Sequence, residues 1–294
     1  MRNRSLSRKI FTFFNYTFLI ALSIVCLLPM LNVLAVSFSS AGAVSAGKVT
    51  FWPIDWNMES YSVVMKHGTF MNSFFVSIER LLLGTLISMV LCVLTAYPLS
   101  KENDRFPWRT IYSWLFVITI LFSGGLIPWY LSVRQTGIID TLWALVLPSA
   151  VNVFNIILIL NFFRGLPKEL EESAHIDGAN HMTVLWRIFV PISMPSLATV
   201  LLLTMVFHWN SWFDGLMFIK NPGNYPLATY LQAVTIDANS LKNLQMQDPD
   251  TLKFVSDRTG RAAQIFLTAL PILLVYPFLQ RYFVKGLVLG SVKG

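Results

Sequence analysis

Apolar stretches without charged residues alternate with polar segments along the whole chain. These stretches cover residues 10–36, 81–100, 110–133, 141–163, 188–213 and 262–280. Each is close to the roughly 20 residues that a helix needs to cross the hydrocarbon core of a bilayer. An open strand would leave backbone groups unpaired in lipid, so each stretch should be helical. The pattern predicts an all-α membrane protein with six transmembrane helices.

We expect one transmembrane domain over residues 1–294, with a polar loop between its fourth and fifth spans. The spans are placed at about 10–36, 74–100, 110–133, 141–163, 188–213 and 262–283. The polar loop covers residues 164–190. Two longer segments, 37–71 and 214–261, should lie on the opposite side of the membrane.

Composition supports lipid as the main solvent. Hydrophobic residues make up 55% of the sequence and charged residues 13%, whereas soluble domains average about 25% charged residues. A soluble domain of this length could not bury so much apolar surface. The first apolar stretch is longer than a signal-peptide core, so we expect a retained first helix.

The positions of Lys and Arg predict the orientation. These residues are dense near the N-terminus, in the 101–109 and 164–187 loops and in the C-terminal tail, and they are sparser in the two long segments. Cytoplasmic loops carry the excess of Lys and Arg, so both termini should face the cytoplasm. Arg80, near the outer end of the second span, is then expected to reach the lipid headgroups.

The net charge of +7 is explained by this topology, and no basic strip interleaved with aromatic residues indicates nucleic-acid binding. Cys26 and Cys92 fall in or beside apolar spans, which does not indicate a disulfide framework. The four histidines lack metal-ligand spacing. We therefore expect no catalytic, cofactor or metal site in this chain.

The polar loop has the sequence of a helix, a turn and a second helix. Pro167 can occupy a first helical position, and the acidic residues that follow it suit the positive end of a helix dipole. Asp177-Gly178 should end this helix, because Gly adopts the left-handed conformation without strain. Asn180 can cap the next helix. Composition alone would also allow an ordinary cytosolic connector.

The same loop resembles the "EAA" loop by which permeases of binding-protein-dependent ABC importers contact their ATPase. The matching residues are Glu172, Ala174, Asp177, Gly178, Ala179, Pro191 and Pro195, and Ser173 lies among them in the expected ATPase-coupling segment. Ser173 stands where alanine is usual, and Leu185 stands where an aromatic residue is common. The resemblance implies a type I ABC importer permease fold in which this loop holds the coupling helix.

The C-terminal tail resembles the ending of maltose-type sugar permeases, specifically the second, shorter permease subunit. In that family the tail reaches between the ATPase subunits, which implies such contacts for Lys285, Gly290, Lys293 and Gly294. Trp209-Asn210 and Tyr225-Pro226-Leu227 also resemble this carbohydrate subfamily. The alginate importer of a soil bacterium is the nearest member that we suggest, with alginate oligosaccharides as candidate cargo.

The resemblance implies several partners in a bacterial cytoplasmic (inner) membrane. These are a paralogous permease subunit, two ABC ATPase subunits, an extracytoplasmic solute-binding protein and an oligosaccharide. This chain has no G-x-x-x-x-G-K-[ST] phosphate loop. ATP and Mg are therefore expected to bind to the separate ATPase.

Five residues are candidates for the substrate pathway: Asn152, Asn155, Trp209, Asn210 and Trp212. Aromatic faces and amide groups suit sugar rings. Aromatic residues near the end of a span also form interface belts, and asparagines in spans also bond helix to helix. Two other functions stay open: a peptide or amino-acid ABC importer permease, and a polytopic membrane enzyme.

Overall fold

The computed structural model describes residues 6–66, 68–236 and 258–291, and within these ranges it is mainly helical and contains no strand. This confirms the all-α prediction for the part described. The chain divides into two compact units, one of residues 1–70 with 233–270 and one of residues 71–232 with 271–294. Each unit is described separately below, and the single-domain boundary stays a prediction.

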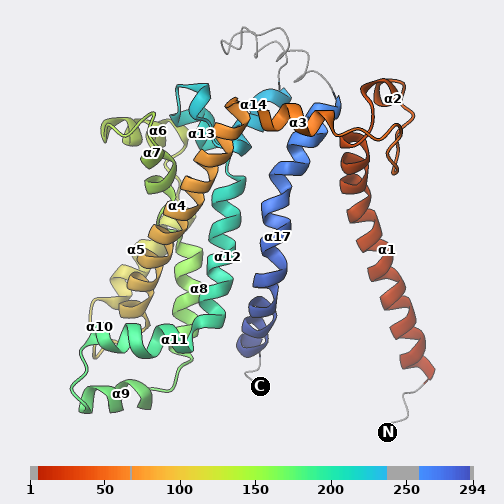
Figure 1. Cartoon of the computed structure of the whole chain (residues 1–294). Coiled ribbons are helices and arrows are strands. Elements are labelled where there is room, and N and C mark those ends of the chain that lie inside the picture. The colour runs from red at the N-terminus through yellow and green to blue at the C-terminus, as the bar shows by residue number, and fades with distance from the viewer. Residues whose placement is uncertain (1–5, 67, 237–257, 292–294) are drawn as a thin grey trace. The chain divides into compact units, whose positions relative to one another are not determined.

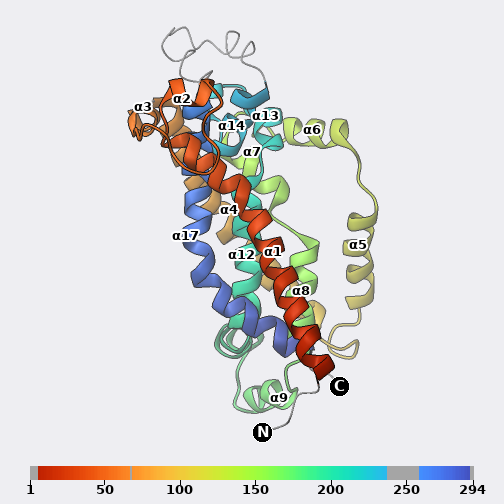
Figure 2. The ribbon, with the colours of Figure 1, turned by 90° about the vertical axis from the view of Figure 1, so that its right-hand side faces the viewer.

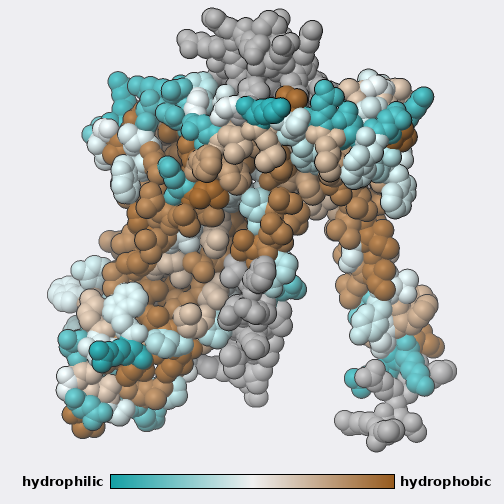
Figure 3. All heavy atoms as spheres, viewed as in Figure 1, coloured by the Kyte–Doolittle hydropathy of each residue, from teal (hydrophilic) through white to brown (hydrophobic). Residues whose placement is uncertain are grey.

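The first unit is dominated by one long helix. It contains α1 (Leu6–Ser37), α2 (Ala41–Ser45), α3 (Glu59–Lys66) and the first part of α17 (Arg258–Ser291). Only 6% of the most apolar part of α1 is buried, and hydrophobic residues cover its middle in Figure 3. A single apolar helix with so little protein around it is suited to lipid or to a partner subunit.

The end of α1 is joined to α3 by polar and aromatic contacts. Ser37 Oγ and the Tyr61 hydroxyl lie 2.7 Å apart. Phe38 stacks on Trp56 at 4.5 Å and on Tyr61 at 4.8 Å between ring centroids. Such offset aromatic pairs contribute about 0.5–1.5 kcal/mol beyond the area that they bury.

The second unit holds the remaining elements. They are α4 (Gly68–Ser100), α5 (Arg109–Leu121), α6 (Leu126–Gln135), α7 (Leu142–Val146), η1 (Leu147–Ser149), α8 (Val153–Arg164), α9 (Glu169–Ile176), α10 (His181–Val184), η2 (Leu185–Phe189), α11 (Val190–Ile192), α12 (Met194–Asn210), α13 (Phe213–Phe218), η3 (Pro222–Asn224) and α14 (Leu227–Ile236). Helices α4, α8 and α12 run alongside one another, and α5 lies against α8 (Figures 1 and 2).

Three of the six predicted spans are bent pairs of helices. The two helices of a pair meet at 118° for α5 and α6, at 47° for the 142–149 and 153–164 helices, and at 83° for the 181–192 and 194–210 helices. Counting each pair as one span gives up to six spans among the described residues. Six therefore remains the predicted count.

Each break has a local cause that apolar periodicity does not reveal. Gly125 has a φ of 84° after the Ser123-Gly124 step, so the backbone turns sharply before α6. Pro148 lies in η1, and Asn152 caps α8 by accepting a hydrogen bond from the Asn155 N–H. Pro195 is at the start of α12 and cannot continue the ladder of the preceding helix.

One face of α4 packs closely on α12. A Cβ added at Gly84 would lie 2.6 Å from the His208 ring, so only glycine permits this separation of the two helices. Ser73, Ser77 and Ser88 are buried on α4 as well. Ser77 Oγ accepts a hydrogen bond of 2.6 Å from the Leu227 N–H at the start of α14.

Arg80 is fully buried, so the prediction that it reaches the headgroups is wrong. Its guanidinium pairs with the Asp214 carboxylate and donates a 2.9 Å hydrogen bond to the Ser211 carbonyl. Asp214 also accepts hydrogen bonds from Ser211 Oγ and from the Gly215 N–H. An intramembrane charge is tolerated when it is paired, and here the partner lies 134 residues away along the chain.

Candidate functional site

Residues 164–190 form a helix, a turn and a second helix, as the sequence predicts. The first helix, α9, begins at Glu169, two residues later than the Pro167 start, and Lys168 precedes it. Acidic residues occupy the first turn of α9, where the helix dipole favours negative charge. Gly178 has a φ of 80°, and Asn180 Oδ1 caps α10 by accepting a 2.8 Å hydrogen bond from the Thr183 N–H.

Contacts across the turn hold α9 and α10 together. The Ala179 N–H donates to the Ala174 carbonyl at 2.9 Å. His175 Nδ1 lies 2.9 Å from the Ala179 carbonyl, and the His175 and His181 rings meet edge to face at 4.9 Å. The turn is therefore a defined structure within the loop.

A buried ion pair attaches α9 to the end of α4. Lys101 Nζ donates a 2.8 Å hydrogen bond to Glu171 Oε2, and each side chain is only 9% exposed. The same ammonium lies 3.9 Å from the centroid of the Tyr97 ring and 4.2 Å from that of Phe189. Aromatic faces attract cations, so Lys101 joins α4, α9 and η2 at one point.

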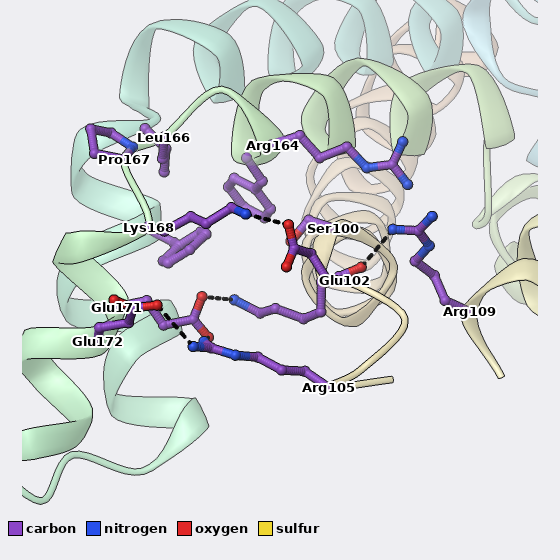
Figure 4. Close-up of a pocket in the computed structure, with 13 residues that line it drawn as sticks. Ser100, Glu102, Arg105, Arg109, Arg164, Leu166, Pro167, Lys168, Glu171 and Glu172 are labelled. Carbon is purple, nitrogen blue, oxygen red and sulfur yellow. Dashed lines mark hydrogen bonds and ion pairs between the residues drawn. The ribbon is translucent and has the colours of Figure 1, made fainter. Parts of the chain in front are cut away.

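Three further ion pairs extend this contact into a network. Arg105 approaches Glu171 and Glu172 at 3.3 Å each, and Lys168 pairs with Glu102. Figure 4 shows these side chains around a pocket of about 380 Å³ between the 101–109 loop and the start of α9. We call the six residues Lys101, Glu102, Arg105, Lys168, Glu171 and Glu172 the ion-pair network.

The electrostatics of the network favour a charged Glu171. Burial opposes its charge, but the hydrogen bond and charge of Lys101, with Arg105 nearby, hold the pKa of the carboxyl below its usual value. Burial also lowers the pKa of the Lys101 ammonium, although Glu171 favours its charged form. A carboxyl group whose pKa is lower in the folded than in the unfolded state stabilises the fold at pH values above its pKa in the unfolded state. The Lys101–Glu171 pair is therefore present at neutral pH and is lost as the pH falls through the pKa of Glu171 in the folded state.

Glu171, His175 and His181 offer ligand atoms that all lie within 4.8 Å of one another. This donor set is of the kind that binds zinc. However, Glu171 is already paired with Lys101 and Arg105, and two adjacent cations disfavour a metal ion. The arrangement fits the ion-pair network better than a metal centre.

The outer side of the loop carries exposed apolar side chains. Ile176 is 86% exposed and Met182 is 59% exposed. Glu172, Ser173, Asp177, Gly178 and Pro191 are also exposed. Solvent-exposed apolar residues on an otherwise polar loop are typical of a protein contact surface.

Ala174 lies on the opposite side, away from that surface. It is 9% exposed and belongs to the core cluster that contains Val184, Leu185 and Phe189. Its small side chain therefore allows α9 to lie close to α10 and η2. Although Ala174 matches the EAA loop, it is not part of the exposed surface of that loop. Ala179 is half-buried beside it.

Two of the five pathway candidates face one cavity of about 180 Å³. Asn152 and Asn155 line it together with Ser88, Ser149 and Thr204. Asn155 Nδ2 also donates a 3.1 Å hydrogen bond to Thr204 Oγ1, so this side chain does bond α8 to α12. A second cavity of about 210 Å³ shares Ser149 with the first and reaches Asp214.

The other three candidates are not among the residues that line these two cavities. Trp209 is 4% exposed and packs edge to face on Phe74, with centroids 6.2 Å apart. Asn210 is exposed and donates to the Val206 carbonyl of its own helix. Trp212 is 37% exposed and lies next to the start of α13. The structure thus does not bring all five residues to one site.

The proposed tail contacts are only partly within the described residues. Lys285 and Gly290 fall within helix α17. Lys293 and Gly294 lie outside the described residues, as does the 237–257 part of the long 214–261 segment.

Sequence reasoning missed Lys101, Arg105 and Glu171 as a joint feature. The only signal in the sequence was that two separate loops carry opposite charges. Because loops commonly carry charges of both signs, this signal does not indicate that the residues pair. It also missed Asp214 as the partner of Arg80, because nothing local links positions so far apart.

Comparisons with known proteins agree with the geometry. The family described as "Binding-protein-dependent transport system inner membrane component" matches residues 1–288. The polygalacturonan/rhamnogalacturonan transport system permease protein YtcP of Bacillus subtilis (strain 168) is 35% identical over 289 residues, covering 98% of this chain and 100% of that protein. Protein LplC of the same organism is 40% identical over 288 residues, covering 97% and 96%.

A solved structure has the same fold. A chain in the crystal structure of a bacterial ABC transporter involved in the import of the acidic polysaccharide alginate matches with a TM-score of 0.86 and 29% identity. The match covers 96% of this chain and 100% of that one.

Proposed function

Because this chain belongs to the family of binding-protein-dependent transport system inner membrane components, we propose that it is the permease subunit of an ATP-driven carbohydrate importer. As a permease subunit it is not itself an enzyme. ATP hydrolysis is assigned to two separate ABC ATPase subunits, and a paralogous permease is assigned as the second half of the pathway. The extracytoplasmic binding protein would deliver cargo on the side of residues 37–71 and 214–261.

One observation supports the coupling role above others: α9 and α10 form a defined surface that is fixed to the end of a transmembrane helix. The buried Lys101–Glu171 pair makes this link, and Ile176 at the end of α9 is freely exposed. A force on the outer side of α9 would therefore be transmitted to α4. In this proposal α9 is the coupling helix, and it faces the cytoplasm together with both termini.

The cargo that we propose is an acidic oligosaccharide. Among the similar proteins, one is named for polygalacturonan and rhamnogalacturonan transport, and another takes part in the import of alginate, an acidic polysaccharide. The cavity at Asn152 and Asn155 would supply amide and hydroxyl groups to sugar hydroxyls. The bends in three spans would let the pathway open alternately to the two sides.

Transport by the reconstituted complex tests this cargo. Proteoliposomes with both permeases, the ATPase and the binding protein would be given oligogalacturonate, alginate oligosaccharide or a neutral glucose oligomer of equal length. We expect ATP-dependent uptake of at least one acidic oligomer at a rate about tenfold or more above the neutral one, equivalent to roughly 1.4 kcal/mol. Equal or faster uptake of the neutral oligomer would contradict the proposed cargo.

Replacing Gly178 with valine is expected to uncouple ATP hydrolysis from uptake. A β-branched residue at a φ of 80° costs about 1–3 kcal/mol of backbone strain, which would displace α10 relative to α9. Uptake should fall about tenfold or more while ATPase activity persists. Gly178→Asn is the control, because asparagine tolerates this conformation, and it should retain most uptake. Normal uptake by the valine variant would exclude a coupling role for the turn.

A further inference from the structure

We propose that a crevice between α5 and α8 binds an anionic phospholipid, with its phosphate between Arg109 and Arg164. The crevice has a volume of about 410 Å³ and includes both arginines in its lining. Arg109 is the first residue of α5 and Arg164 is the last residue of α8. Since α5 and α8 are antiparallel neighbours (Figure 2), both cations lie at the same end of the crevice.

The lining changes from basic to apolar along the helices. Thr110, Ser113 and Asn161 lie near the two arginines, and Val117 and Ile157 line the crevice further along. Val117 follows Arg109 by eight residues, which is about 12 Å along a helix axis. A polar end followed by an apolar wall of this length matches a headgroup and the upper part of an acyl chain.

Neither arginine of the crevice is held in an ion pair by the neighbouring acids. The three acids of the ion-pair network are each paired with Lys101, Arg105 or Lys168. Within the described chain, neither Arg109 nor Arg164 makes a salt bridge. Figure 4 shows their guanidinium groups side by side at the edge of the pocket.

Both guanidinium groups keep hydrogen-bond donors free for a ligand. Arg109 Nη1 donates to the Lys101 carbonyl at 2.9 Å, and Arg164 Nη2 donates to the Leu99 carbonyl at 3.1 Å. A guanidinium has five N–H donors, and its fork geometry suits phosphate oxygens. Two adjacent like charges repel each other, so a phosphate between them would relieve that repulsion.

The apolar wall favours a lipid over a soluble phosphate. No residue of α5 is buried, and Ile111, Trp114 and Ile118 are at least half exposed. In a bilayer these side chains face hydrocarbon, so a lipid enters the crevice laterally. Basic pockets between transmembrane helices are known to recognise anionic headgroups. This site requires only that the chain lies in a membrane, and it does not depend on the cargo.

Native mass spectrometry of the purified transporter complex tests the site. The delipidated complex would be titrated with phosphatidylglycerol, phosphatidylcholine or inorganic phosphate. We expect preferential retention of phosphatidylglycerol. Retention should be about fivefold weaker in Arg109→Gln and in Arg164→Gln, because each variant loses one cation that attracts the anionic headgroup. Arg134→Gln, an exposed arginine on α6, is the matched control and should bind as the unaltered complex does.

A second variant separates the headgroup from the chain contact. Ile157→Trp would fill the apolar part of the crevice and leave both arginines in place, so phosphatidylglycerol retention should fall while complex assembly is unchanged. Equal retention of the two lipids would overturn the proposal, as would unchanged binding in both arginine variants. Inorganic phosphate that displaces phosphatidylglycerol in the unaltered complex would show a site for a soluble anion instead. A complex that retains no phosphatidylglycerol would show that another occupant, such as a partner helix, fills the crevice.

Discussion

Replacing Arg80 with leucine is expected to destabilise the second unit by about 3–5 kcal/mol, the usual cost of removing one partner of a buried ion pair. The substitution would leave the Asp214 carboxylate, whose side chain is 9% exposed, without its cation. The contacts that remain are Ser211 Oγ and the Gly215 N–H. The α12–α13 connection should then separate from α4, which thermal unfolding of the purified complex and hydrogen exchange at residues 211–219 would both detect.

Three further variants test whether the loss of stability comes from the Arg80–Asp214 pair. Arg80→Lys should also destabilise the fold, because an ammonium cannot reproduce the two-point contact of a guanidinium. Arg80→Met combined with Asp214→Asn should recover part of the loss, since no unpaired charge remains. Glu79→Gln, an exposed carboxylate at the adjacent position, is the control and should leave stability unchanged. Equal stability of Arg80→Leu and Glu79→Gln would mean that the pair does not hold α4 to α13.

Replacing Glu171 with leucine is expected to abolish the coupling between ATP hydrolysis and transport. Lys101 would be left buried beneath α9 without its carboxylate. We expect this to destabilise the attachment of α9 by about 3 kcal/mol. This is the low end of the range for buried ion pairs, because the adjoining pocket is large enough to admit water. A shift of that size changes the ratio of attached to detached loop by about two orders of magnitude. Uptake in proteoliposomes should fall accordingly, while ATPase activity should no longer respond to the loaded binding protein.

Two variants distinguish this coupling from general loss of structure. Lys101→Met with Glu171→Leu replaces the pair by apolar side chains, which is often neutral or stabilising, and it should restore attachment of α9 and much of the uptake. Glu102→Gln removes an exposed partner of Lys168, and exposed pairs contribute little, so uptake should stay near normal. If Glu171→Leu and Glu102→Gln transport equally well, the buried Lys101–Glu171 pair has no role in coupling.

The helical class, the approximate spans and the helix–turn–helix form of the polar loop could all be predicted from the sequence. An uncharged apolar stretch of about 20 residues is long enough to cross a bilayer as a helix, so such stretches predict transmembrane segments directly. The turn at Gly178 and the cap at Asn180 follow from local backbone preferences. What apolar runs could not show was where a span bends. The 118° break before α6 depends on the conformation of a single glycine within an uncharged stretch.

The contacts that fix the site were beyond sequence reasoning, because they join positions far apart in the chain. Lys101 and Glu171 are 70 residues apart, and each could be explained locally as a topology charge or a helix-dipole charge. Ala174 matched a motif, but whether it faces a partner or the core depends on how α9 packs. The substrate-pathway candidates were chosen by residue type, and packing placed only Asn152 and Asn155 in the same cavity.

Cross-linking from Ile176 tests most directly whether the outer side of α9 docks on the ATPase at the cytoplasmic face. Ile176→Cys would be placed in a chain whose Cys26 and Cys92 are replaced by serine, with Trp52→Cys, an 81% exposed position in the 37–71 segment, as the matched control. We predict that Cys at position 176 cross-links to the ATPase in the assembled complex and resists a membrane-impermeant thiol reagent in intact cells, while Cys at position 52 reacts with that reagent. Labelling of position 176 from outside the cell, or an assembled complex without a cross-link to the ATPase, would contradict the account.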